Sequence, residues 1–316
     1  MRYQLEMSKL RGQCFDGAAS MSGCKTGLAK RIRIEEPRAL FTHCYGHSLN
    51  LGCNDCMNRV PLLRNCLGTA NEIIKLVKNS PKRNAIFNQI RAQLEESLPG
   101  IRVLCPTRWT VRAKSLESIL ANYEILLQTW EEAKRDTSDS EVRARMLGVE
   151  KSMETFETYF GLSLAYLLLK HSDNLSKALQ KSSISAAEGQ SLAKLTVQTL
   201  NSLKTEEMFD GFWSKNLKHS ENLVGEPELK RPRKIPKKLD KPEPKIYSSP
   251  KEYYQEIYSD SLDKLTSYIE ERFHQEGYET YKNLEELIVS AAKGEPYETE
   301  FDFVTTGTCY PIRNIF

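Results

Sequence analysis

The sequence predicts an α/β fold with predominantly helical content, and two patterns indicate this fold class. Over the first sixty residues, short apolar runs alternate with stretches of helical spacing, which is typical of a β-α-β-α order. From Pro61 onward, apolar residues recur at steps of three and four, which is the period of an amphipathic helix. With 316 residues and 40% hydrophobic content, the chain is long and apolar enough to bury a core.

The first sixty residues are expected to contain two strands and two helices. Cys14 and Phe15 lie in a short apolar strand that ends at turn-forming residues from Asp16 to Gly23. A helix is predicted through 28–32, a second buried strand over 39–45, and another helix through 49–57.

Helices dominate the middle of the chain. The spacing from Leu63 to Val77 predicts an amphipathic helix that stops near Ser80, and a second helix ends before Pro99. Residues 101–105 are expected to be a short strand or an extended segment. Apolar residues then form one helical face from 116 to 130, and a longer, more buried helix follows through 153–169.

A polar segment separates the helical middle from the C-terminal part. Residues 226–250 hold six prolines among many lysines and arginines, which is typical of an exposed, flexible segment. Helical spacing returns from Tyr254 to Phe273 and again near Leu284. The predicted segments are therefore 1–60 (α/β), 61–225 (helical), 226–250 (flexible) and 251–316 (helical).

The composition of the chain limits which partners and which cellular locations we expect. The net charge of +3 favours no particular partner. The sequence holds no run of about 18 apolar residues and no secretion signal at its start, so we expect no membrane partner. Eight scattered cysteines in a chain with a sizeable core favour reduced thiols and an intracellular location.

Four stretches together resemble the hAT superfamily of DNA transposases, in particular the zinc-finger MYM-type branch. They are Arg11 to Gly23 (RGQCFDGAASMSG), Cys44 to Leu51 (CYGHSLNL), Thr107 to Thr110 (TRWT) and Asn174 to Gln180 (NLSKALQ). The resemblance implies a partial RNase H-like core over 1–60 followed by a large α-helical insertion. It also implies a nuclear location.

The family resemblance assigns a chemistry to Asp16. Such enzymes hold two divalent metals with three carboxylates for an in-line phosphoryl displacement, and Asp16 resembles the second of the three. The first carboxylate would precede the chain's start, and the third is not recognisable before Phe316. We therefore expect no cofactor here, although Mg²⁺ or Mn²⁺ would serve the ancestral activity. Without metal, Asp16 is a strand-end residue that accepts from nearby turn amides.

The resemblance also suggests DNA contacts. Cys44 and His47 resemble a family Cys-x-x-His pair, and Arg108 with Trp109 resembles a pair that stabilises a flipped base. Purely structural roles are the alternatives. Cys44 would then be a buried cysteine beside a hydrogen-bonded His47, and Trp109 would be packed in the core. Zinc ligation by Cys44, His47, Cys53 and Cys56 is disfavoured, because Cys56 would lie about 13 Å along one helix from His47.

Basic residues in the polar segment suggest nuclear import or phosphate contact, with a solvated linker as the alternative. They are Lys230, Arg231, Arg233, Lys234, Lys237 and Lys238. The expected function is a transposon-derived, noncatalytic nuclear protein that binds DNA weakly and nonspecifically, or binds nuclear proteins, with no small-molecule substrate. The alternative is a truncated transposase whose missing carboxylates are encoded elsewhere.

Overall fold

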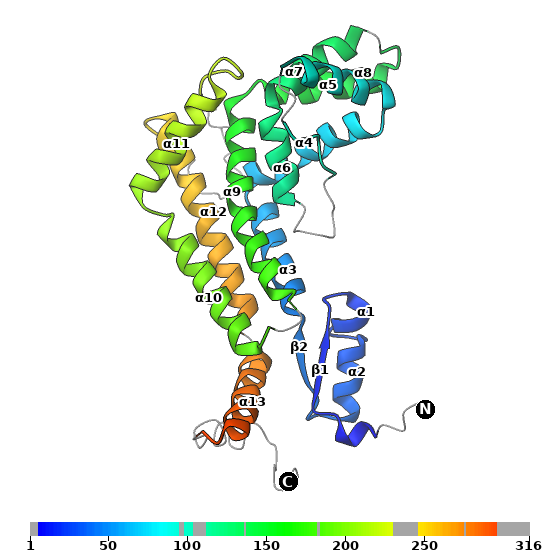
Figure 1. The fold of residues 1–316 in the computed structure, drawn as a ribbon, viewed down its shortest axis with the longest axis vertical. Helices are drawn as coiled ribbons and strands as arrows, with labels where there is room; N and C mark the ends of the chain where they lie inside the picture. The colour runs from blue at the N-terminus through cyan, green and yellow to red at the C-terminus, as the bar shows by residue number, and fades with distance from the viewer. Residues whose placement is uncertain are drawn as a thin grey trace, which may run out of the picture. The chain divides into compact units, whose positions relative to one another are not determined.

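A computed structural model describes residues 6–94, 98–103, 112–135, 137–181, 184–229, 246–274 and 276–295 (Figure 1). This part of the chain is predominantly helical and contains one two-stranded parallel sheet. The predicted helical predominance is therefore confirmed. None of the helices in the described ranges is long and apolar enough to cross a membrane.

The chain divides into two compact units, each built from segments that are distant in sequence. The first unit comprises residues 1–54, 174–199 and 266–316, and the second comprises 55–173 and 200–265. Several long helices contribute residues to both units: α3 (Tyr45–Arg59), α9 (Phe156–Leu179), α10 (Ala186–Ser202) and α12 (Pro250–Phe273). The segment boundaries expected at 60, 225 and 250 stay predictions.

The first unit contains the sheet. Strand β1 (Gly12–Phe15) pairs in parallel with β2 (Leu40–His43), and α1 (Ala19–Ser22) and α2 (Leu28–Glu35) form the crossover between them. The buried Gln13 amide donates to the carbonyl oxygens of Ala29 and Ala39 at 3.2 and 3.1 Å, which fastens the crossover to β1. The predicted order of two strands and their intervening helix is confirmed.

Helix α13 (Glu276–Lys293) packs against β2 in the same unit. Gly277 permits this approach, since a Cβ at that position would lie 2.5 Å from Cγ2 of Thr42 and 3.0 Å from the carbonyl oxygen of Phe41. The absence of a side chain at Gly277 therefore lets the start of α13 come close to the backbone of the strand.

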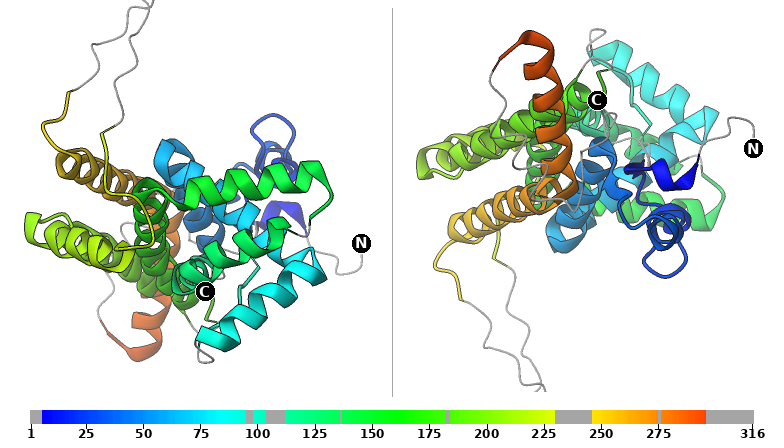
Figure 2. Two further views of the ribbon diagram at one scale, coloured as in Figure 1. Left: turned by 90° about the horizontal axis from the view of Figure 1, so that it is seen from above. Right: turned by 90° about the horizontal axis from the view of Figure 1, so that it is seen from below.

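The second unit is helical. Helices α4 (Pro61–Lys78), α5 (Pro81–Leu94), α7 (Tyr123–Arg135) and α8 (Ser140–Met153) pack on one another (Figures 1 and 2). The indole of the fully buried Trp130 donates to the sulfur of Met153 at 3.2 Å, and the hydroxyl of Tyr123 donates to the Met153 carbonyl at 2.7 Å. These bonds satisfy the polar atoms of two large buried aromatic side chains.

An aromatic cluster joins α9, α12 and α11 (Glu206–Ser220) within the second unit. Phe156 and Phe160 of α9 contact Trp213 of α11 and Tyr254 of α12, with ring centroids 4.7 to 6.1 Å apart. Rings at these separations add to the stabilisation from area burial. The apolar spacing of α9 predicted a deeply buried helix, and this cluster is part of the core in which the helix is buried.

One expected helical face is split. Residues 116–130 form two helices, α6 (Arg112–Ala121) and α7, which meet at Asn122. The Asn122 amide donates to the carbonyl oxygens of Pro99 and Ser118 at 2.8 and 2.7 Å. This buried side chain fixes the break between the helices by holding the segment around Pro99 against it. Residues 101–103 form no strand, and 104–105 lie outside the described residues.

Candidate functional site

Asp16 lies at the carboxyl end of β1, in an exposed turn. Its carboxylate accepts a hydrogen bond from the backbone N–H of Ala18 at 3.1 Å. The adjoining Gly17 packs against α3, since a Cβ there would lie 2.5 Å from Nε2 of His47 and 3.2 Å from Cδ1 of Leu51. Asp16 thus makes the turn contact expected of a strand-end aspartate, and the turn lies beside His47.

Cys44 and His47 have different surroundings. Cys44 joins β2 to α3: its N–H donates to the Phe15 carbonyl at 3.1 Å, and its carbonyl accepts from Ser48 at 2.9 Å. Its side chain is exposed, so the expectation of a buried cysteine is wrong for Cys44. The reason is position, because Cys44 follows the last paired residue of the strand, whereas Cys53 and Cys56 on α3 are buried.

A pocket of about 320 Å³ lies beside Cys44 and includes Cys14, Tyr45 and Tyr278 in its lining. The Tyr45 and Tyr278 rings stack with centroids 4.3 Å apart. The Tyr278 hydroxyl donates to the His43 carbonyl and lies 2.9 Å from the Ser48 hydroxyl. Burial raises the pKa of the Cys14 thiol, whereas a nucleophilic thiol needs a lowered pKa. The Cys14 thiol is therefore poorly suited to act as a nucleophile.

Glu285 of α13 also faces this region of the first unit. Its carboxylate accepts from the backbone N–H groups of Ala186 and Ala187, at 2.6 and 3.4 Å, and so caps the start of α10. A carboxylate at a helix N-terminus satisfies donors that have no partner within the helix. Across the described ranges, no three His, Cys, Asp or Glu side chains are grouped to hold a metal ion.

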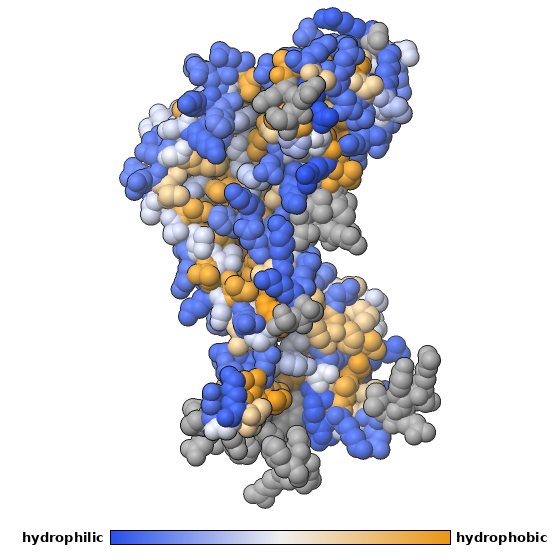
Figure 3. Space-filling model, viewed as in Figure 1, coloured by the Kyte–Doolittle hydropathy of each residue, from blue (hydrophilic) through white to orange (hydrophobic). Residues whose placement is uncertain are grey.

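Four exposed cations lie close together in sequence on the crossover: Lys25 in the turn before α2, and Lys30, Arg31 and Arg33 on α2. None of them pairs with an acidic residue in the described part of the chain. Arg38, by contrast, is held by Glu36 at 2.6 Å. Figure 3 shows a weakly hydrophobic surface over α1 beside hydrophilic and hydrophobic patches over α2. We call these four residues the α2 basic face.

The α2 basic face was not among the residues singled out from the sequence. Its signal is present there, because four cations fall within the nine residues from Lys25 to Arg33 and no acidic residue lies between them. The exposed Glu35 follows them at the end of the helix. The near-zero net charge of the whole chain hides this local excess.

Other predicted site residues lie outside the described residues. Arg108 and Trp109 belong to this group, as does the basic segment with Lys230, Arg231, Arg233, Lys234, Lys237 and Lys238. Their roles stay predictions.

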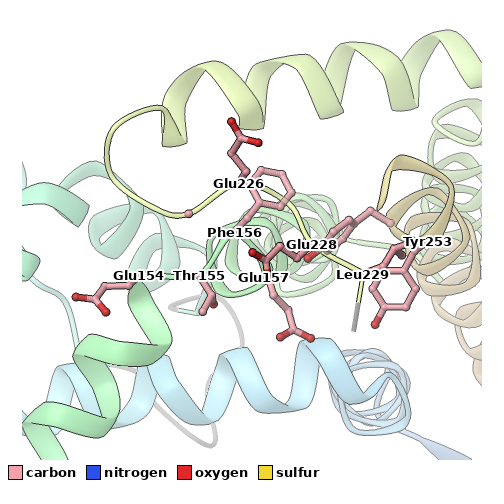
Figure 4. A pocket seen from close by; sticks show the side chains of 10 residues that line it. Glu154, Thr155, Phe156, Glu157, Glu226, Glu228, Leu229 and Tyr253 are labelled. Carbon is pink, nitrogen blue, oxygen red and sulfur yellow. The ribbon is translucent and has the colours of Figure 1, made fainter. Parts of the chain in front are cut away.

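A pocket of about 280 Å³ in the second unit is lined by four glutamates together with aromatic rings (Figure 4). Glu154, Glu157, Glu226 and Glu228 come from two chain segments, and their carboxylates point in different directions. Divalent cations need several oxygens directed at one point. These four carboxylates do not form such a site.

No protein-family model matches this chain, and no solved structure gives a significant match. The resemblance to hAT transposases therefore stays a prediction from the four sequence stretches.

Proposed function

We propose that this chain is a noncatalytic nuclear protein derived from a hAT-type transposase, and that it binds nucleic acid weakly through phosphate contacts. Its β1–α1–α2–β2 segment, with α13 against β2, would correspond to part of an RNase H-like core. The parallel pairing with a helical crossover is compatible with that origin. The observation that carries the binding proposal is the α2 basic face.

The α2 basic face suits a polyanion for two reasons. Its cations are exposed and unpaired among the described residues, so binding phosphate requires no ion pair to be broken. Each cation that neutralises a phosphate releases counterions, which makes binding favourable at low salt and independent of sequence.

Salt dependence of duplex binding tests this proposal. Anisotropy of a labelled 20-base-pair duplex would be measured over a series of salt concentrations for the wild type and for Lys25→Gln/Lys30→Gln/Arg31→Gln/Arg33→Gln. We expect the slope of log K against log salt to fall by up to about 3 to 4, at roughly 0.9 for each phosphate that the variant no longer neutralises.

A matched control removes the same charge elsewhere. Lys114, Lys151, Lys194 and Lys218 are equally exposed and lie outside the crossover, so their replacement by Gln should change the slope much less. If the slope fell equally in both variants, binding would depend only on the net charge of the protein. That result would contradict a specific role of the α2 basic face.

The noncatalytic part of the proposal concerns Asp16, the carboxylate that the family resemblance assigns in this chain and that accepts a hydrogen bond from a turn amide. A plasmid-nicking and strand-transfer assay with Mg²⁺ or Mn²⁺ tests it, with Asp16→Asn as the control for contaminating nuclease. Activity that Asp16→Asn abolishes would contradict the proposal and favour a functional transposase.

Nuclear import through the basic segment is tested separately in cells. The full chain fused to a fluorescent protein should lose nuclear accumulation in Lys230→Ala/Arg231→Ala/Arg233→Ala/Lys234→Ala. It should retain accumulation when Lys114, Lys151, Lys194 and Lys218 are replaced by alanine. Unchanged accumulation in the first variant would leave the segment as a linker.

A further inference from the structure

A second pocket, of about 390 Å³, lies among α6, α9 and α11 within the second unit. Half-buried Tyr166, Leu167 and Phe212 form part of its apolar wall. Phe212 is braced by Phe160 and Tyr258, with centroid separations of 5.4 and 5.3 Å. The size lies in the range of small-molecule sites, which is roughly 300 to 1,000 Å³.

Two buried polar side chains in the lining have unused hydrogen-bonding groups. Tyr159 is 6% exposed, and its hydroxyl has no partner among the described residues. Asn216 is 3% exposed; its amide N–H donates to the Phe212 carbonyl at 2.8 Å, while its carbonyl oxygen has no donor in the described chain. Neither atom is among the fully buried side-chain atoms that lack a partner in the described residues, so both are accessible to solvent. A ligand that both donates and accepts hydrogen bonds can pair with them.

The rim of the pocket is positively charged. Lys170 and Lys215 are exposed lining residues without an acidic partner among the described residues. The one acidic lining residue, Glu117, accepts a hydrogen bond from the Tyr166 hydroxyl at 3.0 Å. The Lys170 ammonium lies 5.9 Å from the centroid of the Tyr166 ring. The aromatic wall of the pocket therefore lies next to the lysine at its rim.

We propose that this pocket, which we call the α6–α9–α11 pocket, binds one unpaired nucleotide of a single-stranded nucleic acid. The base lies against Tyr166 and Phe212, its polar edge reaches Tyr159 and Asn216, and the phosphates contact Lys170 and Lys215. Single-strand binding sites combine aromatic platforms with a basic groove in this way. The proposal stands on the second unit alone and does not depend on the α2 basic face.

A nucleotide fits the pocket better than an acidic peptide does. A base presents a flat π-face and a hydrogen-bonding edge in one rigid group, with its phosphate close by. In a peptide, by contrast, the aromatic ring and the carboxylate belong to separate flexible side chains, so ordering both costs more conformational entropy.

The test measures anisotropy of a labelled twelve-residue oligothymidylate on the full chain. Lys170→Ala/Lys215→Ala is compared with Lys177→Ala/Lys218→Ala, which removes two exposed lysines from the same two helices but outside the pocket lining. Tyr166→Ala removes one platform ring, with circular dichroism to confirm folding. We expect Tyr166→Ala to weaken binding about 5- to 150-fold, as removal of one base stack does.

A second readout locates the strand. Ultraviolet cross-linking of a 4-thiothymidine oligonucleotide should label peptides from α9 and α11 that carry Tyr166 or Phe212. The variant that lacks the α2 basic face should lose duplex binding and keep this cross-link, so the two proposals can fail separately.

Two results would overturn the pocket proposal. One is equal oligonucleotide binding by the two double-lysine variants together with no effect of Tyr166→Ala. The other is binding of an acidic, tyrosine-containing peptide, abolished in Lys170→Ala/Lys215→Ala, with no binding of the oligonucleotide at low salt.

Discussion

Replacing Gly161 by alanine tests the packing of the second unit. Gly161 of α9 passes Cys66 of α4 so closely that a Cβ would lie 2.3 Å from the Cys66 sulfur and 3.1 Å from Cγ of Leu62. Cys66 and Leu62 are 3% and 6% exposed, so neither side chain has open space into which it can move. The added methyl group must therefore push α9 and α4 apart.

The magnitude follows from two opposing effects. Overpacking a core costs about 1 to 3 kcal/mol, while replacing a helical glycine by alanine gains roughly 1 kcal/mol. Gly161→Ala should therefore lower the free energy of unfolding by about 0 to 2 kcal/mol. Gly148 of α8 and Gly211 of α11 meet nothing within 4 Å, so alanine there should raise it by up to about 1 kcal/mol.

Urea unfolding followed by tryptophan fluorescence measures these differences, since Trp130 and Trp213 both belong to the second unit. Removing the clashing sulfur supplies an internal check, because Gly161→Ala should cost less in a Cys66→Ala background than in the wild type. If Gly161→Ala stabilises the protein as much as Gly148→Ala does, the close approach of α9 to α4 is refuted.

Three further predictions concern single polar contacts. Asp139 caps α8 by accepting two backbone N–H groups at 2.9 and 3.1 Å, so Asp139→Ala should lower the free energy of unfolding by about 1 kcal/mol in urea titrations; an unchanged midpoint would contradict the cap. The hydrogen bond from Arg38 lowers the pKa of Glu36 from 4.5 to about 2. The resulting stabilisation is present above 4.5 and is lost as the pH falls toward 2, so the stability difference between wild type and Glu36→Gln should shrink over that interval in acid titrations. Tyr278→Phe removes the hydroxyl that lies against Ser48 and should lower the free energy of unfolding by about 1 kcal/mol in thermal melts; a melt identical to that of the wild type would show that this hydroxyl contributes nothing.

Much of the local structure was predictable from the sequence. Helix α4 begins at Pro61, where the residue pattern predicted the change to helical spacing, and the apolar runs around Cys14 and Phe41 form the two strands. Such signals can be read from a few neighbouring residues, because a proline fixes its own backbone angle and because helices and strands have fixed side-chain periods.

The candidate sites depended on tertiary structure to a greater extent. The four cations of the α2 basic face can be recognised from the local sequence, but their exposure and their lack of ion pairs are properties of the folded chain. The sequence pattern paired Cys44 with His47, yet the fold exposes Cys44 beside a pocket and packs His47 against Gly17.

The sequence by itself determined the helical class, the order of the strands and the approximate positions of several helices. Only the tertiary structure decided that Glu117, Tyr166 and Lys215 line one pocket, although about a hundred residues separate the first from the last. Residue spacing sets which face of a helix is apolar. Which helices meet at that face depends on the packing of side chains from distant segments, and no local pattern encodes it.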